Sequence, residues 1–130
     1  MQLASAVVAA AAVRLAVVSG TPQSAHAYVA PAARVYLTEF RQPLIVRVAG
    51  RGAERIRFSC ANPHCVFPPS DQPDQVHRIN ESTYDVDVHD GKAELTLTLS
   101  TVTLGTFIVT ARVADAHSPA GTVRFALTAR

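Results

Sequence analysis

The last third of the chain alternates apolar and polar residues almost without interruption. Three runs show this pattern, each opened by a nearby glycine: Glu94–Leu99, Phe107–Val113 and Val123–Thr128. Alternation with a period of two, bounded by turn residues, predicts strands with one buried face and one solvent-facing side. This feature constrains the fold class more than any other, and it points to no catalytic chemistry.

The middle of the chain carries the same pattern in shorter pieces. Further strands are expected at Arg34–Phe40, Leu44–Ala49, Glu54–Cys60, Val76–Ile79 and Tyr84–His89, the fourth being the weakest. Short strands with turn signals about every ten residues are typical of a sandwich or barrel. We therefore predict an all-β fold, an immunoglobulin (Ig)-like β-sandwich of seven to eight antiparallel strands. The chain has no tryptophan, which excludes an antibody-type Cys-Trp-Cys core.

The amino-terminal segment resembles an export leader. Leu3–Val13 is small and apolar, and Ala25-His26-Ala27 has the small-x-small pattern of a signal-peptidase site. We expect a signal peptide at residues 1–27, cleaved after Ala27, and a folded domain at 28–130. The protein would then be secreted, periplasmic or on the cell surface. Arg14 interrupts the apolar run, so an uncleaved anchor and a structural helix remain alternatives.

Charge and motifs argue against several function classes. The formal net charge is only +2, which gives no electrostatic case for nucleic acid. Ser24 and Ser70 lack the Gly-x-Ser-x-Gly context of a hydrolase. No segment after residue 27 is apolar for the roughly 20 residues that a membrane-spanning helix needs. We predict a protein that is not an enzyme and has no membrane span in the mature chain.

Cys60 and Cys65 are the only cysteines. In an exported protein two close cysteines are expected to pair as a disulfide. A metal site using both thiolates and His64 is the alternative, but the spacing is not that of a Cys-x-x-Cys knuckle and there is no second pair.

A proline-rich stretch follows the cysteines and forms the longest predicted loop, residues 61–75. Long loops on rigid scaffolds often carry function. We expect any binding site to use this loop, with His64, Asp71 and Asp74 as candidates, or an exposed sheet edge that pairs with another strand.

Arginines cluster on the hairpin that joins the strands at Leu44–Ala49 and Glu54–Cys60. They are Arg47, Arg51, Arg55 and Arg57. An anionic ligand is one interpretation, and cross-strand pairing with Asp85 and Asp87 is the favoured one. Alternation places both aspartates on the outer face of their strand, where we expect them to be solvent-exposed.

The strand motifs resemble a known family. They are Phe40–Val48, Arg55–Ser59, Asp90–Ala93 with Leu95–Leu97, and Gly105–Ala111 with Phe125–Thr128. In this order they are similar to the bacterial Ig-like domains repeated in invasin- and intimin-type surface proteins. The resemblance implies a non-catalytic binding or structural module at the cell envelope, with a protein or glycan partner and no cofactor. Gly50–Ala53 departs from the family's usual loop, and the chain holds one unit instead of an array.

The closing segment also resembles a second family, the periplasmic copper-binding proteins of the copper-resistance type. Asp115-Ala116-His117, Gly121 and Phe125 match its spacing. That resemblance implies copper bound by Asp115 and His117, with a histidine at the mature amino terminus. Cleavage after Ala25 would place His26 there, although the family's tryptophan is absent.

Overall fold

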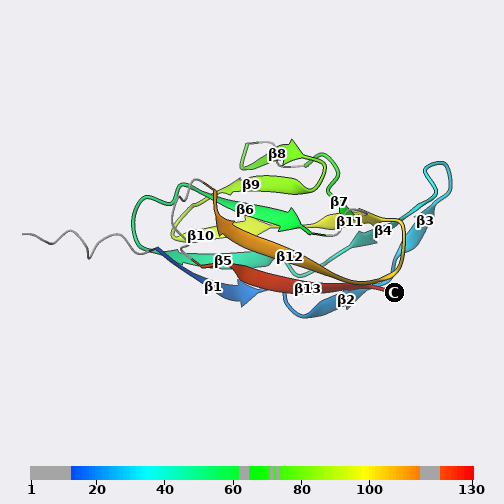
Figure 1. Cartoon of the computed structure of the whole chain (residues 1–130), viewed down its shortest axis with the longest axis horizontal. Coiled ribbons are helices and arrows are strands. Elements are labelled where there is room, and N and C mark those ends of the chain that lie inside the picture. Colours follow the sequence, from blue (N-terminus) through cyan, green and yellow to red (C-terminus); the bar gives the residue numbers. More distant parts are fainter. Residues whose placement is uncertain (1–12, 62–64, 71, 73, 115–120) are drawn as a thin grey trace, which may run out of the picture.

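The computed structural model describes residues 13–61, 65–70, 72, 74–114 and 121–130, and these form an all-β protein without a helix. The all-β prediction is confirmed (Figure 1). The strands are β1 (Arg14–Ser19), β2 (Gln23–Ala25), β3 (Tyr28–Ala30), β4 (Val35–Glu39), β5 (Leu44–Ala49), β6 (Arg55–Cys60), β7 (Cys65–Val66), β8 (Val76–Asn80), β9 (Thr83–Asp87), β10 (Lys92–Leu95), β11 (Thr98–Thr101), β12 (Gly105–Val113) and β13 (Val123–Ala129).

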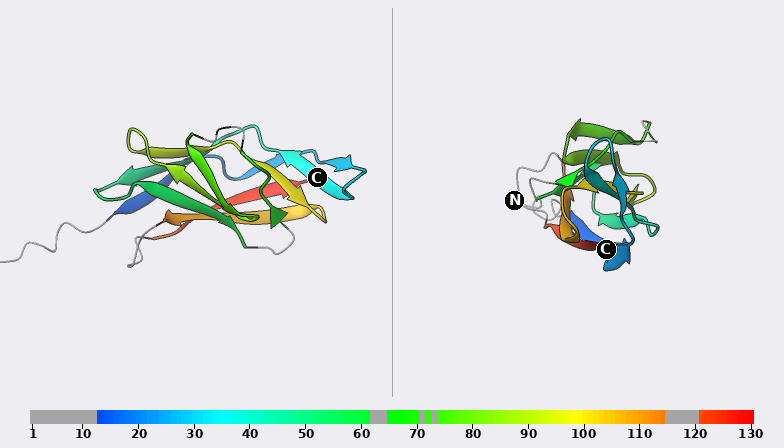
Figure 2. Two further views of the ribbon diagram at one scale, coloured as in Figure 1. Left: turned by 90° about the horizontal axis from the view of Figure 1, so that it is seen from above. Right: turned by 90° about the vertical axis from the view of Figure 1, so that its right-hand side faces the viewer.

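These thirteen strands of the described residues form three sheets, which run along the long axis of the molecule (Figures 1 and 2). The strand orders are β1-β5-β10, β3-β4-β11-β7 and β2-β13-β12-β6-β9-β8. Neighbouring strands pair antiparallel, except that β2 runs parallel to β13. The count exceeds the predicted seven to eight, in part because short strands form upstream of residue 31.

One predicted strand is divided between two sheets. The run Glu94–Leu99 gives the end of β10, which pairs with β5, and the start of β11, which pairs with β4. Between them the backbone N–H of Phe40 donates to the carbonyl of Leu97 at 3.0 Å. This bond joins the β4–β5 junction to the β10–β11 junction, so the first two sheets meet there.

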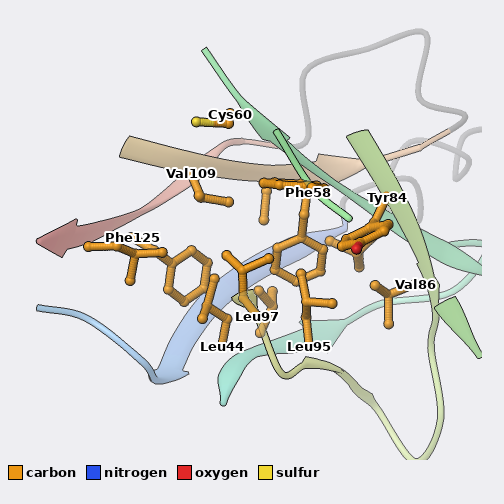
Figure 3. Packing of buried hydrophobic residues seen from close by; sticks show 14 of the residues in the cluster. Leu44, Phe58, Cys60, Tyr84, Val86, Leu95, Leu97, Val109 and Phe125 are labelled. Carbon is orange, nitrogen blue, oxygen red and sulfur yellow. The ribbon is translucent and has the colours of Figure 1, made fainter. Parts of the chain in front are cut away.

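The alternation correctly predicts which side chains are buried. In β12 every second residue from Phe107 to Val113 is buried, and in β13 the same holds from Phe125 to Ala129. All three sheets contribute to one core, which Figure 3 shows around Phe58 and Phe125 with ring centroids 6.0 Å apart. Each large apolar side chain buried in this way contributes roughly 1.5–3 kcal/mol.

The folded region begins upstream of the expected boundary at Tyr28. Strand β1 pairs with β5 from Arg14 onward, and β2 pairs with β13. The two strands therefore lie inside the segment that the sequence assigns to a leader. Within the described part of that segment the backbone is extended, which differs from the structural-helix alternative, and no described helix could span a membrane.

Gly20 allows the chain to pass from β1 to β2. Its φ is +107°, a conformation that side chains other than glycine's rarely adopt. A Cβ added there would lie 2.8 Å from Leu44 Cα and 2.8 Å from the Pro43 carbonyl oxygen, both backbone atoms. The close approach therefore depends on glycine.

Candidate functional site

The predicted cysteine pair is at disulfide distance in the structure. The Cα atoms of Cys60 and Cys65 are 6.1 Å apart, and both residues are buried. The disulfide joins the end of β6 to β7, and β7 pairs with β11 in the four-stranded sheet. It thus ties two sheets together, and a loop this short contributes about 2 kcal/mol in the chain-entropy model.

Most of the other predicted site residues lie outside the described residues. These are Asp115, His117, His64 and Asp71. Asp74 is exposed in the turn before β8. His26 is exposed between β2 and β3, with its Nε2 2.8 Å from Arg130 Nη1. Among the described residues no three His, Cys, Asp or Glu side chains cluster to hold a metal, and the copper hypothesis stays a prediction.

Two of the clustered arginines pair across strands as predicted. Arg57 makes a bidentate contact with Asp85, with Nε 2.8 Å from Oδ1 and Nη2 2.9 Å from Oδ2. Arg55 Nε lies 3.1 Å from Asp87 Oδ1, which is also 3.0 Å from His77 Nε2.

The expected exposure of Asp85 is wrong, because only 4% of this residue is accessible to solvent. Strand β9 lies between β6 and β8, and the register places Arg57 and His77 on either side of Asp85. The side chain of Asp87, nearer the strand end, remains 39% exposed.

A polar surface hollow of about 890 Å³ lies where segments distant in sequence meet. We call it the polar hollow. It is lined by Pro22, Gln23, Ser24, Ala25, His26, Tyr28, Glu39, Arg41, Gln42 and Arg130. The lining comes from β2 and the residues after it, from the turn between β4 and β5, and from the residue that follows β13. The sequence prediction assigned the first part of this lining to the leader.

Gln23 holds two walls of the polar hollow together. Its side-chain Nε2 donates to the carbonyls of Gly20 at 2.9 Å and Gln42 at 2.8 Å. Its Oε1 accepts from the backbone N–H of Gln42 at 3.2 Å. The two contacts with Gln42 fix the start of β2 against the β4–β5 turn.

A backbone ladder fixes the third wall. The N–H of Ala27 donates to the Arg130 carbonyl at 2.9 Å, and the N–H of Arg130 donates to the Ala25 carbonyl at 3.0 Å. The Arg130 guanidinium also contacts His26 through Nη1 at 2.8 Å and Ser24 Oγ through Nε at 3.3 Å. Since a guanidinium only donates, Arg130 is the donor and His26 Nε2 is the acceptor in this contact.

The arginines of the polar hollow are not paired with any carboxylate of the described residues. Within the described residues no Asp or Glu side chain lies within 4.0 Å of the guanidinium of Arg41 or Arg130. Glu39 is the one side-chain carboxylate in the described lining. The lining side chains therefore carry two positive charges and one negative charge at neutral pH.

A second hollow of about 550 Å³ adjoins the first, and we call it the proline hollow. It is lined by Leu37, Glu39, Phe40, Arg41, Pro68, Pro69, Ser70, Gln72, Val76, Tyr84, Thr96, Leu97 and Thr98. Glu39 and Arg41 line both hollows. The Tyr84 hydroxyl donates to the Pro68 carbonyl, and its ring stacks on Phe67 with centroids 4.8 Å apart. Part of the predicted binding loop thus borders a hollow that shares Glu39 and Arg41 with the polar one.

Comparison with known proteins gives no assignment. No family model, no curated protein and no solved structure matches this chain. Its function must therefore be argued from its own residues.

Proposed function

We propose that this chain is an exported, non-catalytic Ig-like binding module of the bacterial cell envelope, and that its partner, a protein or a glycan, binds at the polar hollow. The observation that carries the proposal is a hollow with fixed walls and two arginines that no described carboxylate neutralises. Concave sites with a few convergent polar groups are where ligands bind most often.

An Ig-like sandwich is the arrangement that best accommodates the strand pairing. Strand β1 pairs with β5 in the three-stranded sheet. After Gly20 the chain crosses to the six-stranded sheet, where β2 pairs with β13. The bond from Phe40 to Leu97 links the two smaller sheets. We propose that these two act as one layer, with the six-stranded sheet as the other layer of a sandwich over the shared core.

Export is proposed from the apolar run Leu3–Val13. Because β1 and β2 contribute to the folded domain, we propose that the exported form keeps residues 14–27. Intact mass of protein secreted from an exporting host tests this directly. A chain that begins at or before residue 14 is expected, whereas a chain that begins at Tyr28 would contradict retention of the two strands.

Binding to isolated bacterial envelopes tests the proposed site. We expect the purified chain to sediment with envelopes, and expect the double variant Tyr28→Ala/Arg41→Gln to lose most of that binding. Arg51→Gln is the matched control, because Arg51 is exposed in the β5–β6 turn and does not line the hollow. Equal sedimentation of the double variant and the control would reject the polar hollow as the binding site.

A further inference from the structure

We infer that the polar hollow binds an acidic saccharide, whose carboxylate or sulfate contacts Arg41 and Arg130 while a sugar ring packs on Tyr28. This inference rests on the proposed binding function and names the class of ligand.

The Arg130 guanidinium has unused N–H donors and a fixed orientation, which favour binding of an anion. Of the five N–H donors of a guanidinium, one is directed to His26 and one to Ser24, which leaves three. Neither partner is a carboxylate, so these contacts do not cancel the positive charge. These contacts also orient the planar group before a ligand arrives, which reduces the entropy lost on binding. Arginine recognises carboxylates and other oxyanions by paired donors in this planar geometry.

Arg41 supplies the second charge from a different wall. It lies in the turn that Gln23 fixes through both polar atoms of its side chain. Two guanidinium groups from separate segments in one hollow favour a ligand that carries negative charge. Attraction between such exposed charges is screened by salt, so the affinity is expected to fall as ionic strength rises.

The remaining lining suits a sugar better than an inorganic ion. Tyr28 is 50% exposed, so it offers an aromatic surface with a polar hydroxyl. Ser24, Gln42 and Glu39 add hydroxyl, amide and carboxylate groups that can exchange hydrogen bonds with sugar hydroxyls. A volume of about 890 Å³ is far larger than a sulfate or phosphate needs.

The proline hollow extends the site. Because Glu39 and Arg41 line both hollows, a ligand that fills the polar hollow can continue past them toward Pro68 and Pro69. This continuity favours an oligosaccharide over a single sugar.

Calorimetric titration of the full chain with defined probes tests the inference. The probes are trigalacturonate, its fully methyl-esterified form, a sulfated heparin disaccharide and inorganic sulfate. We expect trigalacturonate or the heparin disaccharide to bind at least tenfold more tightly than the neutral ester and than sulfate. The preferred probe of the two identifies the anionic group as a carboxylate or a sulfate.

Variants locate the binding. Arg41→Gln and Arg130→Gln are each expected to weaken binding of the preferred probe at least tenfold, and Arg51→Gln by less than twofold. Thermal unfolding of each variant verifies that it is folded. Since the Arg41 side chain makes no hydrogen bond or ion pair with the described residues, its substitution tests binding without removing a structural contact.

Three other results of the titration would contradict the inference. If trigalacturonate and its methyl ester bind with equal affinity, the ligand need not be acidic. If inorganic sulfate binds as tightly as the preferred saccharide, the ligand need not be a saccharide. No binding of any probe would overturn the inference as a whole. The proposed function fails separately, only when envelope binding is unaffected by the Tyr28→Ala/Arg41→Gln variant.

Discussion

Two groups of arginines in this molecule differ in how their charge is balanced. On the face of β6 and β9, Arg57 and Arg55 each contact an aspartate of the neighbouring strand. At the polar hollow, Arg41 and Arg130 have no described carboxylate within 4.0 Å. The first group makes ion pairs between neighbouring strands of one sheet, whereas we propose that the second group binds a ligand.

The difference follows from where the residues lie in the sheets. The antiparallel register places Arg57 opposite Asp85 and Arg55 opposite Asp87, so each pair forms within two strands. Arg41 lies in a turn and Arg130 follows the end of β13, beyond the register of any paired strand. An arginine at such a place obtains a partner only if another segment brings one.

The largest expected effect comes from breaking the buried pair. Arg57→Gln leaves the carboxylate of Asp85 buried without its bidentate partner, and we expect the free energy of unfolding to fall by about 2–4 kcal/mol. Urea denaturation measures this change. The double variant Arg57→Gln/Asp85→Asn removes the unpaired charge and should recover part of the loss. A loss below about 0.5 kcal/mol, the range of ordinary surface substitutions, would show that this pair is not structural.

Gly20→Ala should weaken the walls that hold the second group of arginines. The added methyl meets backbone atoms of Pro43 and Leu44 at 2.8 Å in a positive-φ conformation, so we expect a loss of about 2–3 kcal/mol. Gly52→Ala is the control, because Gly52 also has positive φ (+95°) but no atom within 4 Å of the added Cβ. The Gly20 variant should also bind acidic saccharide less tightly. Equal losses in the two variants would mean that the close approach has no energetic weight.

The exposed pair should matter much less than the buried one. Arg55 and Asp87 have side chains 45% and 39% exposed, and such pairs contribute at most about 1 kcal/mol. We expect Arg55→Gln to lower the free energy of unfolding by no more than this amount, and the difference to shrink at high salt. An effect as large as that of Arg57→Gln would contradict the distinction between the two pairs.

The smallest expected change in stability, and the sharpest test of the comparison, comes from Arg41→Gln. Without an ion pair to lose, the free energy of unfolding should change by less than about 0.5 kcal/mol, while saccharide binding falls at least tenfold. Denaturation and titration of the same preparation measure both quantities. A substantial loss of stability would mean that Arg41 has a structural role like that of Arg57.

The sequence predicts the parts of the fold that depend on local pattern. Alternation in Phe107–Val113 assigns the buried face correctly. The expected pairing of the clustered arginines with Asp85 and Asp87 is found for Arg57 and Arg55. The burial of Asp85 could not be predicted, because a strand was expected at Val76–Ile79 but no local pattern shows that it pairs with β9. Strand β1 was missed because its first residues continue an alanine-rich apolar run that resembles a leader.

The polar hollow could not be predicted from local sequence patterns. Ser24 and Arg130, which touch across it, are 106 residues apart in sequence. No spacing or motif links them, and only the pairing of β2 with β13 brings them together. A disulfide between residues five positions apart could be predicted from its spacing, whereas this contact could not.

The parallel pairing of β2 with β13 has a mechanical consequence. In Figure 1 the chain enters β1 at one end of the long axis and leaves β13 at the opposite end. Tension applied through Arg14 and Arg130 therefore loads the pairing of β1 with β5 and, beyond Gly20, pulls β2 and β13 in opposite directions along their length. Their hydrogen bonds are loaded together in shear and do not open one at a time. If this protein is tethered at an envelope, the hydrogen bonds between β2 and β13 that form part of the polar hollow also resist extension of the chain under load.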